Sequence, residues 1–488
     1  GLRDFLSPIS TPKLSKTSLT QSSGSSRREI LRAGLTGFTT LSLAGVNQLR
    51  AATAARGADD STEKTAVILV WLRGGCSHLD TFDPKPDVST DYRGPFNPID
   101  TNVPGMHVTE LLPKLSQCAD RYALLRSVAH DAGGHPAGSL RVLAGDPDRA
   151  DKRLPVLPDW MSIVSWLRRT ENGGIPNYVS VNPVDRYDSF TIAGATYLGP
   201  SYDAFKVTGD PSRPDFRVPN VGMADAARAR RLLERRALSS NFDRLRGDVD
   251  QFGLMQAFDD FGSQALNLLT SPAAGEAFDL SREPAQLRDR YGRNAWGQQC
   301  LMARRLVEAG VDVVATEFDG PLCGRVANWD DHAVNHHVFE AISHRAPFFD
   351  QAVSALIEDV YARGLDRRVL VVVTGEFGRT PRISNVASSG GGVASRPKGT
   401  VQPGRDHWPR ANSMLFAGGG IRTGQVIGST DHYGEDPVDR PVSPLDFLAT
   451  IYRHLGIDYE NTAIVNFAGR PVPILNDGHA IPELDRVV

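Results

Sequence analysis

The sequence predicts an α/β fold, a three-layer sandwich built on a mostly parallel central sheet. Short apolar runs rich in β-branched residues, such as residues 66–71 and 369–374, are typical of strands buried on both faces of a parallel sheet. Amphipathic segments such as residues 298–309 and 347–363 separate these runs and are typical of helices covering such a sheet. Strands that alternate with helices along the chain favour this architecture over an all-β or all-α fold.

The expected elements follow one another from residue 64 onward. We expect strands at residues 66–71, 122–128, 177–181, 311–316 and 369–374. We expect helical segments at residues 111–118, 160–169, 223–269, 298–309, 347–363 and 444–456. Residues 64–488 are therefore expected to form one domain, in which residues 155–270 are a partly helical insertion or cap.

Composition narrows the class of protein. The chain has 488 residues, 40% of them hydrophobic, which is enough for a sizeable core. Its formal net charge of -3 gives no basic surface for nucleic acid. The four cysteines, Cys76, Cys118, Cys300 and Cys323, are widely separated, so they neither require nor exclude a disulfide.

The N-terminal segment resembles a twin-arginine export signal. Arg27 and Arg28 precede a weakly apolar run, residues 33–46, and a small-residue site at residues 52–54. We therefore expect residues 1–63 to be signal peptide and linker, and the mature protein to be periplasmic or extracellular in a bacterium. The alternative is a disordered basic tail. We expect no transmembrane segment in the mature chain.

Histidines and carboxylates recur where the expected strands end. Because the carboxyl ends of parallel strands meet at one edge of a sheet, we expect these loops to lie together. Imidazoles mixed with carboxylates suit a divalent metal ion, here zinc, calcium, manganese or iron. The candidate ligands are His78, Asp80, His135, Asp330, His332, Glu376, Asp406 and His407. The alternative for each one is a loop side chain satisfied by a local partner.

Five motifs in order resemble a known family. They are residues 74–86, 329–332, 375–381, 404–409 and 418–431. Together they resemble the sulfatase-like family catalogued as domain of unknown function 1501, which is related to the alkaline phosphatase and sulfatase superfamily. The resemblance implies an alkaline phosphatase-like fold and metal at the C-terminal edge of the sheet. It also implies that the metal holds a phosphate or sulfate ester.

The chain departs from the superfamily pattern at three places. His135 stands where the resemblance expects a nucleophile, Arg73 follows the first strand where an Asp is expected, and Glu376 with Phe377 replaces an Asp-His pair. His135 is a candidate metal ligand, nucleophile or general acid, and we favour the ligand. Arg73, Arg379 and Arg405 are candidates to bind an anionic ester, or else form buried ion pairs.

These observations predict an exported, metal-dependent hydrolase of anionic esters, with His135, Arg379 and Arg73 as catalytic candidates. The expected substrate is an anionic small molecule or a sulfated or phosphorylated glycan. The alternative is a non-catalytic, metal-containing envelope protein that binds a glycan or another envelope protein. The missing Ser, Thr or Cys at the nucleophile position favours that alternative.

Overall fold

The computed structural model describes residues 64–169, 175–219, 221, 271–320, 328–392 and 394–486. The expected signal segment, residues 1–63, and the expected helical segment at residues 223–269 lie outside these residues. None of the helices in the described part of the chain combines the length and apolar composition needed to cross a bilayer.

An eight-stranded sheet lies at the centre, with the order β16-β4-β15-β10-β1-β9-β5-β8. Its strands are β1 (Ala66–Trp71), β4 (Tyr122–Val128), β5 (Tyr178–Val181), β8 (Phe205–Val207), β9 (Val313–Glu317), β10 (Val369–Thr374), β15 (Asn412–Gly418) and β16 (Gln425–Ile427). Only β15 runs antiparallel to its neighbours β10 and β4, and the other strands all run in one direction. The predicted mostly parallel sheet is confirmed.

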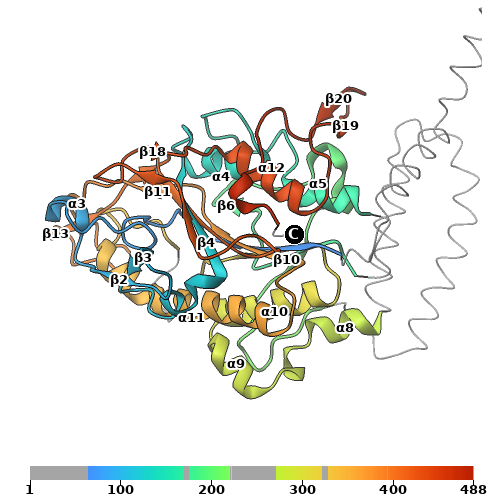
Figure 1. Ribbon diagram of the computed structural model, residues 1–488, viewed down its shortest axis with the longest axis horizontal. Helices are drawn as coiled ribbons and strands as arrows, with labels where there is room; N and C mark the ends of the chain where they lie inside the picture. The colour runs from blue at the N-terminus through green and yellow to red at the C-terminus, as the bar shows by residue number, and fades with distance from the viewer. Residues whose placement is uncertain are drawn as a thin grey trace, which may run out of the picture. The chain divides into compact units, whose positions relative to one another are not determined.

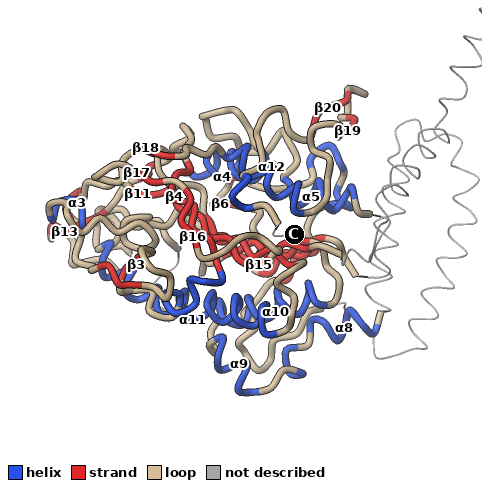
Figure 2. Tube along the Cα trace, in the orientation of Figure 1, coloured by secondary structure: helices blue, strands red, loops and turns tan. Residues whose placement is uncertain are grey.

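Helices cover both faces of this sheet (Figure 1). One layer contains α4 (His135–Ala144), α5 (Trp160–Leu167) and α12 (Pro444–His454). The other contains α10 (Ala295–Glu308) and α11 (Val338–Ala362), with α8 (Pro272–Phe278) and α9 (Ala285–Tyr291) packed against them. Figure 2 shows the strands as a continuous layer between the two sets of helices. The three-layer sandwich is therefore confirmed.

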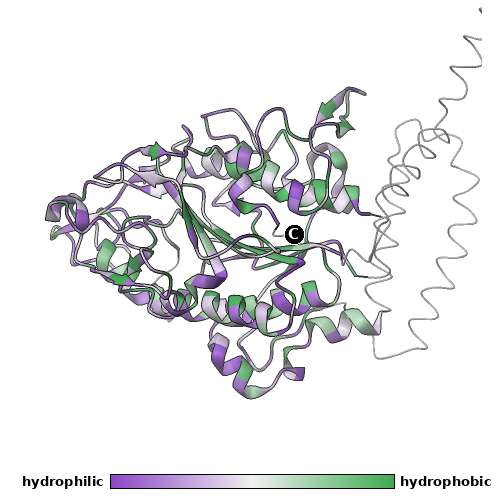
Figure 3. Cartoon of the chain, viewed as in Figure 1, coloured by the Kyte–Doolittle hydropathy of each residue, from purple (hydrophilic) through white to green (hydrophobic). Residues whose placement is uncertain are grey.

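Alternation along each strand divides the core between the two faces. In β1, Val67 and Leu69 pack into the core beneath α4, α5 and α12, whereas Ile68 and Val70 pack toward α10 and α11. Both sets are fully buried, because successive side chains of a strand point to opposite faces. The central strands are accordingly among the most hydrophobic segments in Figure 3.

Shorter elements connect these layers. They are α3 (Thr90–Arg93), β2 (Pro98–Asp100), β3 (His107–Thr109), β6 (Arg186–Tyr187), β7 (Phe190–Thr191), β11 (Gly378–Arg379), β12 (Ser384–Ala387), β13 (Val401–Gly404), β14 (His407–Trp408), β17 (Ser429–Thr430), β18 (Pro437–Asp439), β19 (Ala463–Val465) and β20 (Pro471–Pro473). Short 3₁₀ helices occur at Leu115–Arg121, Thr196–Leu198, Pro200–Tyr202, Leu280–Arg282 and Pro482–Leu484.

Several boundaries differ from the sequence prediction. Helix α11 begins nine residues before Pro347, at Val338, because the side chain of His337 accepts a hydrogen bond from the backbone N–H of Glu340 and caps an earlier turn. The region expected as an insertion or cap also contributes to the sandwich itself. Its described part supplies α5, β5 and β8, so residues 155–219 extend the sheet and one helical layer.

Candidate metal centre

The site lies where the parallel strands end. His135 opens α4, which follows β4, and Glu376 follows β10. His407 lies in β14, just before β15. Because β15 is antiparallel, its first residues lie at the edge where its parallel neighbours finish. Because β15 is reversed, the loop before it, which carries His407, lies beside the loops that follow β4 and β10.

Four side chains converge at this edge: His135, Asp330, His332 and His407, whose candidate ligand atoms all lie within 4.8 Å of one another. The Nε2 atoms of the three histidines are 3.2, 2.9 and 3.2 Å from the same oxygen, Oδ1 of Asp330. Nε2 of His332 is also 3.0 Å from Nε2 of His407. We call these four residues the His/Asp cluster.

The other ring nitrogen of each histidine has its own acceptor. Nδ1 of His135 is 2.7 Å from Oε1 of Glu376, and Nδ1 of His332 is 2.7 Å from Oδ1 of Asp406. Nδ1 of His407 is 2.8 Å from the backbone carbonyl oxygen of Gly133. Carboxylates and carbonyls only accept, so each Nδ1 must donate its proton. In the neutral form, each Nε2 then presents a lone pair to the centre of the cluster.

This arrangement attracts a cation. Three lone pairs and one carboxylate oxygen face one another and repel without positive charge between them. Nε2 of His135 is buried without an aligned hydrogen-bond partner, although Oδ1 of Asp330 is 3.2 Å away. Metal-binding histidines usually donate their other ring N–H to a carboxylate or a backbone carbonyl, as these three do from Nδ1. The tautomers and the unpartnered nitrogen both fit a metal ligand set.

The spacing also fits. Bonds of about 2.0–2.1 Å to a tetrahedral ion place its ligand atoms about 3.3–3.4 Å apart. The spacings of 2.9–3.2 Å around Oδ1 of Asp330 are a few tenths of an ångström shorter. Small side-chain movements would therefore admit an ion. The side chains of Asp330, His332 and His407 are 20%, 22% and 23% exposed, so the cluster is open to solvent on one side.

The pKa values of the four cluster residues are shifted by burial and by the charges that surround them. Burial lowers the pKa of His135, but the carboxylates of Asp330 and Glu376, which stabilise the protonated imidazolium, outweigh burial and raise it overall. Asp330, whose Oδ1 would accept a hydrogen bond from Nε2 of the protonated ring, raises the pKa of His332. Burial lowers the pKa of His407. Burial also opposes ionisation of Asp330, yet the three histidines, whose Nε2 atoms would donate to its carboxylate when protonated, and the charge of Arg379 hold its pKa far below the usual range. Asp330 is thus a permanent negative charge.

Arg379 holds the Asp330 loop rather than facing solvent. Its Nη2 is 2.7 Å from Oδ1 of Asp330, and it also donates to the carbonyl of Gly74. Its Nε and Nη1 donate to the carbonyls of Gly75 and Arg405, at 3.0 and 3.2 Å. Gly74 has a φ of +100°, and a Cβ there would lie 2.6 Å from the backbone nitrogen of Asp330. Only glycine permits this close approach.

Arg73 is also paired with carboxylates of the protein. It forms ion pairs with Asp319 at 2.8 Å and with Asp188 at 3.2 Å. Its guanidinium lies 4.4 Å from the ring centroid of Tyr187. Arg405 is fully buried and pairs with Asp80, with Nε 2.8 Å from Oδ2. The three arginines expected to bind an ester are therefore all engaged with carboxylates of the protein.

Two predicted ligands lie outside the cluster. Nε2 of His78 is 2.8 Å from the carbonyl oxygen of Gly434, and Asp80 pairs with Arg405. The first loop turns both side chains into the protein, where local partners satisfy these atoms. Glu376 and Asp406 do adjoin the cluster, but they contact the Nδ1 atoms and not its centre.

Sequence reasoning missed Tyr187 and the carbonyl of Gly133. Tyr187 stacks on His135 with a centroid distance of 4.0 Å and an interplanar angle of 12°. Its hydroxyl is 3.4 Å from Oδ2 of Asp330. Tyr187 lies on a short hairpin far from the motifs, and no pattern in the sequence marks it. A backbone acceptor such as that of Gly133 leaves no sequence signal at all.

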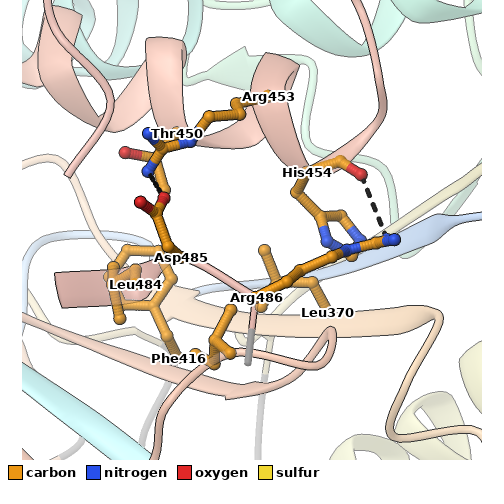
Figure 4. Close-up of a pocket in the computed structure, with 9 residues that line it drawn as sticks. Leu370, Phe416, Thr450, Arg453, His454, Leu484, Asp485 and Arg486 are labelled. Carbon is orange, nitrogen blue, oxygen red and sulfur yellow. Dashed lines mark hydrogen bonds and ion pairs between the residues drawn. The ribbon is translucent and has the colours of Figure 1, made fainter. Parts of the chain in front are cut away.

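A separate cavity of about 350 Å³ lies at the opposite edge of the sheet (Figure 4). It is lined by Leu370, Phe416, Ile421, Thr450, Arg453, His454, Leu484, Asp485 and Arg486. Arg453 forms an ion pair with Asp485, and Nη2 of Arg486 donates to the carbonyl of His454 at 3.4 Å. Leu370 lies at the start of β10, so this cavity is remote from the His/Asp cluster.

Comparisons with solved structures show distant similarity to several proteins. A 2-O GAG sulfatase is 12% identical, with a TM-score of 0.33, over 81% of this chain and 71% of that one. A protein in the alkaline phosphatase superfamily from Vibrio parahaemolyticus is 10% identical, with a TM-score of 0.35, over 82% and 68%. A phosphonate monoester hydrolase from Silicibacter pomeroyi is 12% identical, with a TM-score of 0.32, over 81% and 73%. Similarity at this level transfers no activity to this chain.

A search of curated proteins finds no match to this sequence. The family model described as "Protein of unknown function (DUF1501)" matches residues 64–484. That range covers the sheet, both helical layers and every member of the His/Asp cluster. The chain therefore belongs to the DUF1501 family, as its five motifs suggested.

Proposed function

We propose that this protein is a metal-dependent hydrolase of anionic esters, either phosphate or sulfate. The observation that carries the proposal is the convergence of three Nε2 atoms on Oδ1 of Asp330, with every Nδ1 held by its own acceptor. A metal site needs imidazoles whose orientation is fixed by hydrogen bonds at Nδ1 and whose Nε2 atoms point to one position. A substrate would reach the cluster from its solvent-exposed side, where Asp330, His332 and His407 are partly exposed.

His135, Asp330, His332 and His407 would hold the ion. Three nitrogen donors and one oxygen favour zinc, iron or manganese over calcium, which takes oxygen ligands. A divalent ion bound there supplies Lewis acidity toward an ester oxygen and lowers the pKa of bound water to about 7 in favourable sites.

The protein's own residues prepare this centre. Glu376 and Asp406 fix the tautomers of His135 and His332, which keeps both Nε2 atoms available as ligands. Arg379 fixes the carboxylate of Asp330 through a 2.7 Å ion pair. On the buried side Tyr187 stacks on His135, and the ring centroid of Phe377 is 5.2 Å from that of His135. These aromatic rings exclude water from one face, so an ester would approach past His332 and His407.

A second candidate function is a non-catalytic, metal-containing envelope protein that binds a glycan or a neighbouring protein. The engagement of Arg73 and Arg379 with carboxylates favours it, because neither guanidinium is free to pair with an anionic ester. Under either function we propose export by the twin-arginine route, on the strength of Arg27 and Arg28 in the N-terminal segment.

Two measurements on the purified protein separate these functions. Elemental analysis without chelator should find about one equivalent of zinc, iron or manganese. Chromogenic phosphate and sulfate esters, each assayed with these three ions, should show turnover that a chelator abolishes and the ion restores. Bound metal without turnover on any ester would favour the binding protein. Absence of bound metal after incubation with each ion would overturn both functions.

A further inference from the structure

Tyr187 of the hairpin β6–β7 contacts the His/Asp cluster. Tyr187 ends β6, and its ring lies parallel to that of His135 at a centroid distance of 4.0 Å. Its hydroxyl is 3.4 Å from Oδ2 of Asp330, the oxygen that does not face the three histidines. Tyr187 therefore contacts two of the four members of the cluster in two different ways.

A guanidinium completes a stack around this ring. The Cζ atom of Arg73 lies 4.4 Å from the ring centroid of Tyr187. Two planar groups cannot both lie about 4 Å above one face of a ring, so Arg73 and His135 cover opposite faces. Cation–π attraction between guanidinium and ring strengthens the contact. The order Arg73, Tyr187, His135 forms a three-layer stack that ends at a candidate metal ligand.

Ion pairs anchor the outer layer of the stack. Nη1 of Arg73 is 2.8 Å from Asp319, two residues beyond β9. Nη2 of Arg73 is 3.2 Å from Asp188, the residue that follows Tyr187 in the hairpin. Arg73 thus links the hairpin to the loop that follows β9 and packs on the ring of Tyr187.

We propose that Tyr187 is a positioning residue of the metal centre, setting the plane of His135 through the stack with Arg73 and thereby the affinity for the ion. The inference rests on the metal site of the proposed function. The imidazole turns about the Cβ–Cγ bond of His135, and the hydrogen bond from Nδ1 to Glu376 restrains that rotation at one atom only. Stacking removes this rotation and directs the Nε2 lone pair at the centre of the cluster.

The test measures ion binding directly. Cobalt is titrated into the metal-free protein and followed by its visible absorption, and dissociation constants come from competition with a chelator. Tyr187→Leu removes the flat ring and should weaken binding by about 10–100-fold, the range for changes that misorient a ligand. It should also shift the cobalt absorption bands. Tyr187→Phe keeps the ring, so its dissociation constant should stay within about threefold of wild type and its bands should be unchanged.

A matched control separates positioning from folding. Tyr197 lies in the 3₁₀ helix Thr196–Leu198, where its ring contacts Phe467 at a centroid distance of 6.4 Å, and it is not part of the cluster. Tyr197→Leu makes the same chemical change and should leave cobalt binding and its spectrum at wild-type values. Unfolding of each metal-free variant, followed by circular dichroism, establishes that the proteins compared are folded.

The outcomes distinguish this inference from the proposed function. If Tyr187→Leu binds cobalt as tightly as wild type, or if Tyr187→Phe is weakened equally, the stacking role is overturned. If wild type binds cobalt but hydrolyses no ester, the hydrolase fails while the role of Tyr187 stands. A wild-type protein that binds none of the tested ions overturns both.

Discussion

Removing His332 is the sharpest test of the His/Asp cluster. His332→Ala deletes one of four converging atoms, since Nε2 of His332 is 2.9 Å from Oδ1 of Asp330. Its side chain is 22% exposed and its partner Asp406 is 54% exposed. The substitution therefore leaves neither a closed cavity nor a buried charge, and we expect little effect on folding in the absence of metal.

The expected loss of affinity follows from sharing the binding energy among the ligands. Structural zinc sites with four protein ligands bind with apparent free energies of about 10–16 kcal/mol. One quarter of this is about 2.5–4 kcal/mol, or about two to three orders of magnitude in the dissociation constant, at about 1.4 kcal/mol per tenfold. We expect His332→Ala to weaken zinc binding by about this factor.

Chelator competition with zinc measures the dissociation constant, and urea unfolding in chelator measures the stability of the metal-free fold. His432→Ala is the matched control, because His432 is an exposed histidine outside the cluster. It should bind zinc as wild type does. A dissociation constant for His332→Ala within threefold of that control would refute the reasoning, and the histidines would then be loop residues satisfied by one another.

Three further predictions follow from named contacts. Glu376→Gln keeps an acceptor for Nδ1 of His135 but loses the charge, so the zinc dissociation constant should rise by about 10–100-fold, and an unchanged value contradicts the role of Glu376. Asp80→Ala leaves Arg405 buried without its carboxylate, which should lower the free energy of unfolding in urea by about 3–5 kcal/mol while metal content stays at the wild-type level. Loss of metal with full stability would instead return Asp80 to the ligand set. Burial lowers the pKa of His454 from 6.5 to about 4, so the unfolded chain takes up a proton between these values that the folded protein does not. The stability that comes from keeping His454 neutral in the folded protein is present above pH 6.5 and is lost as the pH falls toward 4. The loss amounts to at most about 3 kcal/mol in the free energy of unfolding. His454→Gln should show a correspondingly weaker loss of stability in acid urea titrations, and parallel curves for the two proteins would contradict the shift.

The strands were predictable because buried strands appear in the sequence as short apolar runs. Residues 66–71, 122–128 and 369–374 match β1, β4 and β10 residue for residue. Each is a short, mainly apolar run that both helical layers cover, and only Arg126 and Ser127 in β4 and the final Thr374 of β10 depart from the apolar pattern. Predicted helix ends were less accurate, since capping by single side chains such as His337 decides where a helix begins.

The candidate site was only partly predictable. The expectation that imidazoles and carboxylates gather at one sheet edge depends on strand direction, and the parallel sheet brings His135, Asp330, His332 and His407 together. The sequence could not rank these four above His78 and Asp80, which lie in an equally polar loop. Which way a loop turns its side chains depends on partners such as Arg405 and the carbonyl of Gly434, which are distant in the chain.

The sequence by itself determined the α/β class, the family and the loops that carry chemistry, because apolar periodicity and motif spacing are local properties of the chain. Only the tertiary structure decided which nitrogen of each histidine faces the centre, that Arg73 and Arg379 are engaged with carboxylates, and that Tyr187 stacks on His135. Those facts depend on distances and angles between residues up to several hundred positions apart. The cluster forms only in the folded protein, where the antiparallel direction of β15 places His407 at the edge of the sheet where the parallel strands end.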